Sequence, residues 1–268
     1  MVRKVIRSFL PVIIIATILL VASVVSAQGS TRININYIEN GQFPFLEVYT
    51  SVTNAQGFPL KNLSTSDFSL FEDNQSISDF EVVPIQNIKQ PLAIVLLIDT
   101  SGSMGIAPSP TPLQNAITAA KTFIDTLSQQ DHVSIIGFSD TPYVVQDFTD
   151  DKNAVKSKLD SLTAGGNTAL YDGIVDAVTL AKIRSERKII VLITDGTDSG
   201  IGKFDFKTSI DEASRWAIPI YPIGFGNINQ KELEQIAFLT GSVAQIRPNS
   251  LNLQSAFNLV LQVLREQY

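Results

Sequence analysis

The 268-residue sequence has no cysteine and only one histidine, His132. Without cysteine the chain can form no disulfide, no zinc–thiolate site and no thiol nucleophile. It also cannot carry a lipid on an N-terminal cysteine. His132 leaves at most one imidazole for catalysis or for a metal. Because it directly precedes the apolar run Val133–Ile136, we interpret it as a surface residue at the start of a strand.

Charge is also sparse, and the excess is negative. Charged residues make up 17% of the sequence and hydrophobic residues 44%, which is typical of a folded chain with a large core. The net charge is -6, and residues 1–27 carry three basic residues and no acid, so the remainder has a net charge of -9. Such an acidic chain does not attract nucleic acid or anionic membranes and concentrates cations around itself. We therefore expect no nucleic-acid partner.

Residues 1–27 have the pattern of a signal peptide. Arg3, Lys4 and Arg7 form a basic start, Phe9–Val25 an apolar run, and the segment ends in the small residue Ala27. We expect cleavage after Ala27. The apolar run is slightly short for a membrane span and Pro11 interrupts it, but an uncleaved N-terminal anchor is the alternative. It would be the only membrane contact. In either case the rest of the chain is exported, to the cell surface, the envelope or the medium.

Residues 30–89 predict a small all-β, sandwich-like domain. Ile33, Ile35 and Tyr37 alternate with polar residues, as they do in a half-buried strand, and turn signals such as Asn40-Gly41 separate further short strands. About 60 residues form a marginal core, so we expect this domain to rely on its neighbour.

From Pro91 onward, strand patterns alternate with helical periods, which indicates βαβ units and a parallel sheet. Tyr143–Phe148 follows the preceding strand after a short turn, so it is predicted as an antiparallel edge strand. The expected strands are 92–98, 132–138, 143–148, 188–194, 218–225 and 243–246, and the expected helices are 113–127, 153–162, 169–183, 205–216, 230–240 and 251–266.

Two of these strands are unbroken apolar runs that end in aspartate, at Asp99 and Asp195. In open α/β sheets, ligands bind beyond the carboxyl ends of the strands, where the strand order reverses. Residues two apart in an extended turn point the same way, so Ser101 and Ser103 can converge beside Asp99. A glycine-rich loop brings Thr168 to the start of a helix. Converging hard oxygens suit a small hard cation, above all Mg2+.

The pattern Asp99-x-Ser101-x-Ser103, then Thr168, then Asp195 resembles the metal-ion-dependent adhesion site of von Willebrand factor type A domains. Residues 91–268 resemble this family throughout. The resemblance implies a Rossmann-like, doubly wound, mostly parallel six-stranded α/β sheet flanked by helices, which binds a divalent cation, usually Mg2+, with Mn2+ or Ca2+ as alternatives. More loosely, Asn54–Asp73 is similar to the β-domain that precedes the metal-site domain in many exported bacterial proteins.

The resemblance also implies a role for each ligand. The hydroxyls of Ser101, Ser103 and Thr168 would bind the ion directly, while Asp99 and Asp195 would bind largely through water. An Asp or Glu carboxylate of a partner protein would complete the coordination. We interpret two further acids as structural, Asp172 at the positive end of a helix and Asp198 in a turn.

The predicted function is cation-dependent protein binding, in adhesion or assembly, without enzymatic activity. One alternative is a structural subunit of an envelope assembly in which the ion only stabilises the fold. Another is a magnesium-dependent hydrolase of phosphate groups. The hydrolase is disfavoured because the phosphatases with an aspartate at this strand end need a second one two residues later, where this chain has Ser101.

Overall fold

The computed structural model describes residues 2–5, 18–22, 31–39, 43–54, 57–85, 91–106, 109–247 and 249–268. The chain forms two compact units. Unit 1 consists of Met1–Lys89 together with Gln262–Tyr268, and unit 2 consists of Gln90–Leu261. The predicted domain of residues 91–268 is therefore too long at its C-terminal end, because the last seven residues pack with the small β-region.

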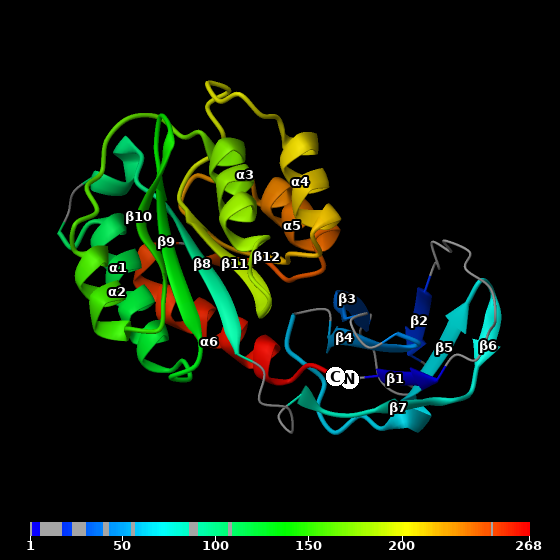
Figure 1. Cartoon of the computed structure of the whole chain (residues 1–268). Helices are drawn as coiled ribbons and strands as arrows, with labels where there is room; N and C mark the ends of the chain where they lie inside the picture. Colours follow the sequence, from blue (N-terminus) through cyan, green and yellow to red (C-terminus); the bar gives the residue numbers. More distant parts are fainter. Residues whose placement is uncertain are drawn as a thin grey trace. The chain divides into compact units, whose positions relative to one another are not determined.

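Unit 2 contains a six-stranded sheet in the order β10-β9-β8-β11-β12-β13 (Figure 1). Only β10 is antiparallel to its neighbour, which confirms the predicted fold class and the antiparallel edge strand. The strands are β8 (Leu92–Asp99), β9 (His132–Phe138), β10 (Pro142–Thr149), β11 (Arg187–Thr194), β12 (Ile220–Phe225) and β13 (Gln245–Arg247).

Helices cover both faces of this sheet, which explains why its central strands are apolar without alternation. Val95 and Leu97 face a core formed with α3, α4 and α5. On α1 and α6, Phe123 and Phe257 pack with ring centroids 5.1 Å apart. The helices are α1 (Pro112–Asp125), α2 (Lys152–Leu159), α3 (Leu170–Ala181), α4 (Phe206–Arg215), α5 (Gln230–Leu239) and α6 (Leu253–Arg265).

The strand order reverses between β8 and β11. After β8 the chain adds β9 and β10 on one side, and it then returns through α2 and α3 to place β11 on the other side of β8. In the register of this pair, Ile98 lies opposite Ile193, so the carboxyl ends of the two strands are level. This is the position in a doubly wound sheet at which ligands bind.

Unit 1 has two antiparallel sheets, in the orders β3-β4-β1-β7 and β2-β5-β6. Residues of both sheets share one core, which contains Val48, Phe68 and Val82, and Tyr268 packs into the same core. The strands are β1 (Val2–Val5), β2 (Ile18–Ala22), β3 (Arg32–Glu39), β4 (Phe45–Thr53), β5 (Phe68–Glu72), β6 (Gln75–Ile77) and β7 (Phe80–Val82).

Strands β1 and β2 fall within the predicted signal peptide. Most of its apolar run, Phe9–Val25, lies outside the described residues, and so does the predicted cleavage position after Ala27. Removal of residues 1–27 therefore stays a prediction. In the part of the chain that the structure describes, no helix combines the length and the apolar character needed to cross a bilayer.

Candidate metal centre

The first segment of the candidate site follows β8. Asp99 is completely buried, and its carboxylate accepts hydrogen bonds from the Ser101 N–H (2.8 Å) and from the Thr194 hydroxyl (2.6 Å). A short 3-10 helix, η3 (Gly102–Gly105), then turns the chain. The hydroxyl oxygens of Ser101 and Ser103 lie 3.2 Å apart as a result. The predicted convergence of these side chains beyond the strand is therefore present.

The end of β11 supplies the next oxygen. Ser103 Oγ donates a 2.6 Å hydrogen bond to Asp195 Oδ1. Four of the five candidate ligands are thus linked by hydrogen bonds across the ends of β8 and β11: Asp99 accepts from the Ser101 backbone N–H, and the side-chain oxygens of Ser101, Ser103 and Asp195 follow one another.

The carboxyl ends of β8 and β11, with the loops that follow them, form one edge of the sheet, which we call the rim. Thr168 reaches this rim from the loop before α3. This loop is tied to the first segment by hydrogen bonds from Gly102 N–H to Gly166 O (2.9 Å) and from Gly165 N–H to Thr100 O (2.8 Å). Thr168 is buried, and a Cβ atom placed on Gly196 would lie 3.6 Å from its hydroxyl oxygen. The Thr168 hydroxyl therefore faces the backbone directly after Asp195, and all five predicted residues share one rim.

Burial makes the two carboxylates of this rim costly to ionise. It raises the pKa of Asp99 to about 6, against the lowering effect of hydrogen bonds from Thr194 and Ser101, and the charge of Asp195 raises it further. Burial also raises the pKa of Asp195. A divalent cation would offset both negative charges, and the donor set of two carboxylates and three hydroxyls suits a hard ion.

The described residues contain no group of three or more His, Cys, Asp or Glu placed to hold a metal. The hydroxyls therefore have to supply part of the ligand set. The only imidazole is remote, because His132 begins β9 whereas Asp99 lies level with Phe138 at its end. Its Nδ1 lies 3.2 Å from a Glu186 carboxylate oxygen, and its side chain is partly exposed, as predicted.

Asp140 supports the Thr168 loop, and the sequence patterns did not reveal it. Its Oδ1 accepts hydrogen bonds from the backbone N–H (2.9 Å) and the side-chain amide (2.8 Å) of Asn167. At Gly166, φ is +82°, and a Cβ atom would lie 2.6 Å from Asp140 Oδ2. Only glycine fits this position, because other residues would meet both backbone strain and a collision.

The loop after Asp195 is held by three further side chains. Ser199 exchanges hydrogen bonds with the Thr168 backbone, through its hydroxyl (3.1 Å) and its N–H (2.8 Å). Asp198 accepts from Gly200 N–H, as expected of a turn residue, and also from Leu170 N–H at the start of α3. Asp172 accepts from the N–H groups of Lys203 and Phe204, so it anchors this loop in addition to lying in the first turn of α3.

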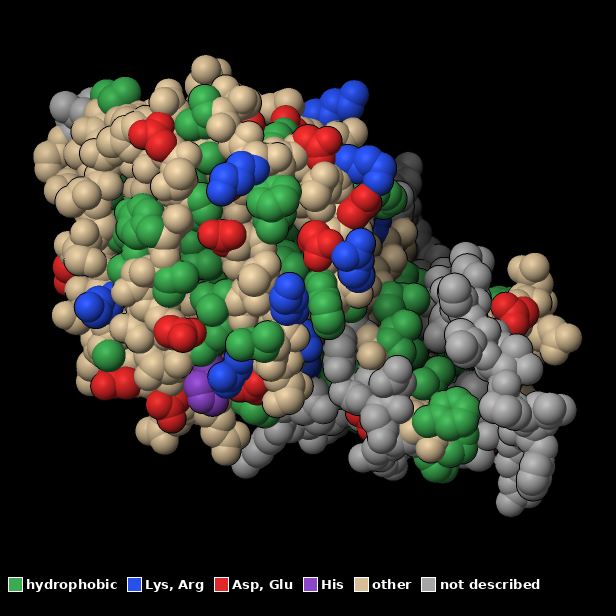
Figure 2. Space-filling view, turned by 45° about the horizontal axis from the view of Figure 1, so that its top comes forward, with side chains coloured by type: hydrophobic (Ala, Val, Ile, Leu, Met, Phe, Trp, Pro, Cys, Tyr) green, Lys and Arg blue, Asp and Glu red, His purple; other side chains and the backbone are tan. Residues whose placement is uncertain are grey.

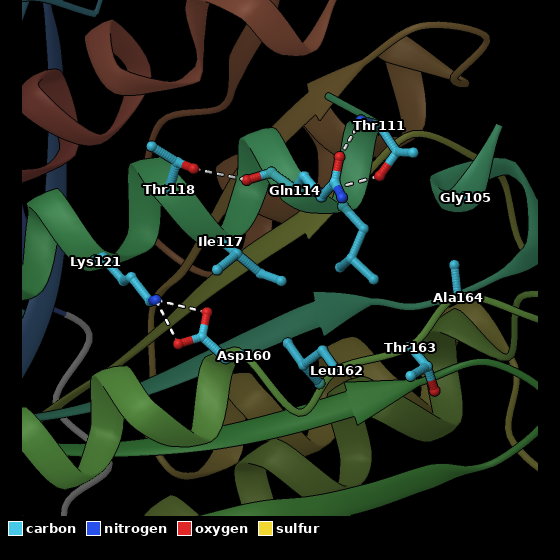
Figure 3. A pocket seen from close by; sticks show the side chains of 11 residues that line it. Gly105, Thr111, Gln114, Ile117, Thr118, Lys121, Asp160, Leu162, Thr163 and Ala164 are labelled. Carbon is cyan, nitrogen blue, oxygen red and sulfur yellow. Dashed lines mark hydrogen bonds and ion pairs between the residues drawn. The ribbon is translucent and has the colours of Figure 1, made fainter. Parts of the chain in front are cut away.

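A groove of about 530 Å³ lies beside the rim (Figure 3). Gly105 and Ala164, from the two ligand-bearing loops, line one end, and the ion pair between Lys121 and Asp160 (2.6 Å) closes the other. The remaining lining residues are a mixture of aliphatic, hydroxyl and amide side chains, namely Thr111, Leu113, Gln114, Ile117, Thr118, Leu162 and Thr163.

On the face of the protein drawn in Figure 2, basic side chains lie among acidic and neutral ones and do not gather into one patch. Several of the basic residues of unit 2 are paired with acids, for example Lys156 with Asp125 (2.6 Å).

The fold and the oxygen-lined rim define a doubly wound α/β domain with a candidate cation site at its switch point. A family model of the von Willebrand factor type A domain matches residues 93–258, more than half of the chain. The chain therefore belongs to the von Willebrand factor type A domain family.

Individual relatives are distant. An uncharacterized protein of Synechocystis is 31% identical over 153 residues, which are 55% of this chain and 35% of that protein, so the chain spans about a third of this curated relative. A von Willebrand factor type A structure from Catenulispora acidiphila has 21% identity and a TM-score of 0.58, and the match covers 88% of this chain and 49% of that one.

A third relative is proximal thread matrix protein 1 from the mussel byssus, with a zinc-occupied MIDAS motif. It has 22% identity and a TM-score of 0.59, and the match covers 66% of this chain and 46% of that one. At this identity the two structural matches establish the fold alone.

Proposed function

We propose that this chain is an exported, cation-dependent protein-binding module. The observation that carries the proposal is the hydrogen-bonded row of candidate ligands from Asp99 to Asp195, at the place in the sheet where the strand order reverses. A buried carboxylate, Asp99, and a half-buried one, Asp195, both with pKa values raised by burial, are an arrangement that a cation stabilises.

Ser101, Ser103 and Thr168 would hold the ion directly, and Asp99 and Asp195 would orient these hydroxyls and bound water. We propose Mg2+ as the ion, with Mn2+ or Ca2+ as alternatives; the zinc-occupied MIDAS motif of the mussel protein supports a divalent cation in this fold. When bound, the ion supplies an electrophilic position that a partner's Asp or Glu carboxylate can occupy, because its direct protein ligands are uncharged hydroxyls.

The groove beside the rim gives the partner a second contact. A segment whose carboxylate reaches the ion can place neighbouring side chains against Leu113, Ile117 and Leu162. The net charge of -9 after removal of residues 1–27 repels acidic partners at long range. The carboxylate contact therefore depends on the metal at short range, and salt should weaken binding much less than metal removal does.

Retention of partner proteins by the immobilised chain, in Mg2+ and in EDTA, tests this function. We expect retention in Mg2+ to be lost in EDTA and to be lost in Thr168→Ala, whereas Thr179→Ala, which removes an exposed hydroxyl on α3, retains the partner. In the retained partner, one Asp→Asn or Glu→Gln change should abolish binding. Retention that survives both EDTA and Thr168→Ala would contradict the proposal and leave the ion a purely structural role.

A further inference from the structure

An aspartate is followed directly by a glycine at two places in the sequence, Asp172-Gly173 and Asp195-Gly196. In such a pair the amide nitrogen of the glycine can attack the side-chain carbonyl carbon of the aspartate, because glycine has no Cβ atom to hinder the approach. The attack forms a C–N bond and releases the carboxyl hydroxyl group and the amide proton as water, which leaves a five-membered succinimide ring. Water then opens the ring at either carbonyl group and gives aspartate or isoaspartate.

The first pair is held by a helix on every side of the reacting groups. Asp172 and Gly173 are both buried in the first turns of α3. Gly173 N–H donates to Ala169 O (3.1 Å), and a Cβ atom on Gly173 would lie 3.2 Å from Phe138 Cγ. The Asp172 carboxylate accepts from two backbone N–H groups of another loop. The backbone therefore has no freedom to bring the Gly173 nitrogen to the Asp172 carboxyl carbon.

The second pair lies in a turn at the rim. Strand β11 ends at Thr194, so Asp195 and Gly196 follow it, and both are only half-buried. Gly196 N–H donates to the Thr194 hydroxyl at 3.2 Å, and Asp195 Oδ1 accepts from the Ser103 hydroxyl at 2.6 Å. Side-chain hydroxyls, and not a helix, thus bind the two reacting groups. A local movement of the turn is sufficient to bring them together.

The other carboxylate of the rim is protected by the residue that follows it. Asp99 precedes Thr100, whose branched side chain hinders attack by the amide nitrogen. Thr100 N–H also donates to Phe138 O (2.8 Å) on the neighbouring strand β9. Asp195 is therefore the candidate metal ligand at which this rearrangement can occur.

The rearrangement would displace the Asp195 carboxylate. In isoaspartate the main chain runs through the former side chain, so it is one atom longer, and the carboxylate is attached to the former Cα. The rim has little room for an additional backbone atom, because even a Cβ atom on Gly196 would lie 3.6 Å from the Thr168 hydroxyl oxygen. The carboxylate would therefore lose its position beside Ser103.

We propose that the rim carries its own inactivation step, in which Asp195 of the metal-free chain rearranges to isoaspartate through attack by the Gly196 nitrogen. This inference rests on the function proposed above, because a bound cation is what prevents the reaction. With the cation in place, Asp195 is restrained together with the three hydroxyl ligands, and attack requires the reacting atoms to approach within about 3.5 Å. A chain that stays without metal thus loses its cation-dependent binding permanently.

The test incubates the full chain in 18O-labelled water at pH 7.5, in Mg2+ and in EDTA, followed by peptide mapping. Each ring opening adds one heavy oxygen, so the label marks every residue that has passed through a succinimide. We expect label at Asp195 in EDTA, at least about tenfold slower labelling there in Mg2+, and none at Asp172 in either. Mapping separates this label from that of Asn40-Gly41, a pair that reacts in the same way with loss of ammonia.

Gly196→Ala is the matched variant, because its Cβ atom would make only an ordinary contact with the Thr168 hydroxyl. It should label at Asp195 at least about tenfold more slowly than the parent in EDTA. After incubation in EDTA, the parent should lose its stabilisation by Mg2+ in proportion to the isoaspartate at position 195. Protein-isoaspartate methyltransferase with S-adenosylmethionine, which returns isoaspartate to the succinimide, should restore part of that stabilisation.

Three outcomes would overturn this inference and leave the proposed function intact. They are no label at Asp195 in EDTA, equal labelling of Asp172 and Asp195, and labelling of Asp195 that Mg2+ does not slow although it raises the melting temperature. If Mg2+ changes neither the labelling nor the melting temperature, the candidate metal site fails, and both proposals fail with it.

Discussion

Replacing Asp99 with asparagine should stabilise the metal-free protein at neutral pH while it abolishes the response to metal. Asparagine has nearly the same size as aspartate and keeps a carbonyl oxygen to accept the Ser101 N–H. Its amide N–H group would face the Thr194 hydroxyl, which can accept a hydrogen bond. The substitution therefore removes the buried charge and preserves the packing at the end of β8.

The magnitude follows from the pKa of Asp99, which burial raises from 3.8 to about 6. Because the pKa of Asp99 is raised in the folded state, between about pH 4 and pH 6 this carboxyl is protonated in the folded chain and ionised in the unfolded chain. The stability of the metal-free parent therefore falls as the pH rises through this window, and the loss is complete above it. A shift of about two units corresponds to about 3 kcal/mol. We expect Asp99→Asn to gain about 2–3 kcal/mol at pH 7.5 and less than about 1 kcal/mol at pH 4.

Urea unfolding followed by fluorescence measures this gain, because the single tryptophan, Trp216, lies in unit 2 directly after α4. The parent and the variant are compared in EDTA at pH 7.5 and pH 4, and again in Mg2+ at pH 7.5. Mg2+ should stabilise the parent and leave the variant unchanged, so it reduces or reverses the difference between them.

Asp172→Asn is the matched control, because Asp172 is also buried but binds two backbone N–H groups outside the rim. Loss of these charge-assisted hydrogen bonds should cost about 1 kcal/mol, and Mg2+ should stabilise this variant as it does the parent. The reasoning is refuted if Asp99→Asn is less stable than the parent in EDTA at pH 7.5, or if its advantage persists at pH 4.

Three further outcomes are expected. Mg2+ at a hundredfold excess over its dissociation constant should raise the free energy of unfolding by about 2.7 kcal/mol, and melting curves that Mg2+, Mn2+ and EDTA leave unchanged would eliminate the site. Thr168→Ala should fold, by circular dichroism, and lose most of this Mg2+ response; if it unfolds instead, Thr168 is a core residue. Tyr268→Ala should destabilise unit 1 by about 3–5 kcal/mol in calorimetry, because the ring packs in its core. Tyr268→Phe should cost only about 1–2 kcal/mol, because it removes the hydrogen bonds with Leu60 O (3.0 Å) and Leu63 N–H (3.1 Å). Neither change should affect Mg2+ binding.

The fold of unit 2 could be predicted because its strands and helices carry clear periodic signals. The runs that become β8 and β11 are apolar throughout, a pattern that only a sheet covered on both faces explains. The predicted helix 153–162 is shorter in the structure, as α2 ends at Leu159. Helix ends depend on individual hydrogen bonds, which residue periodicity does not encode.

The candidate ligands could be predicted because a strand fixes the direction of the residues that follow it. The residues that hold the ligand loops in place could not. Asp140, Ser199 and Thr194 are short polar residues of a kind that occurs in every turn, and each acts on a loop 27–95 positions away in the sequence. Their role depends on which loops meet at the rim, and this is decided by the strand order.

Sequence patterns also fail to predict which segments of the chain make up unit 1. The amphipathic pattern of Leu251–Glu266 correctly predicts a helix, and that helix begins in unit 2. Nothing in the periodicity indicates that Tyr268 pairs with Thr50, 218 residues earlier, or that its ring enters the core of the other unit. The spacing of apolar residues predicts which face of a helix or strand is buried, but it does not predict the core into which that face packs. Consequently the closing segment of the β-region is apparent only from the backbone hydrogen bonds that Gln267 and Tyr268 make with Ile85 and Thr50.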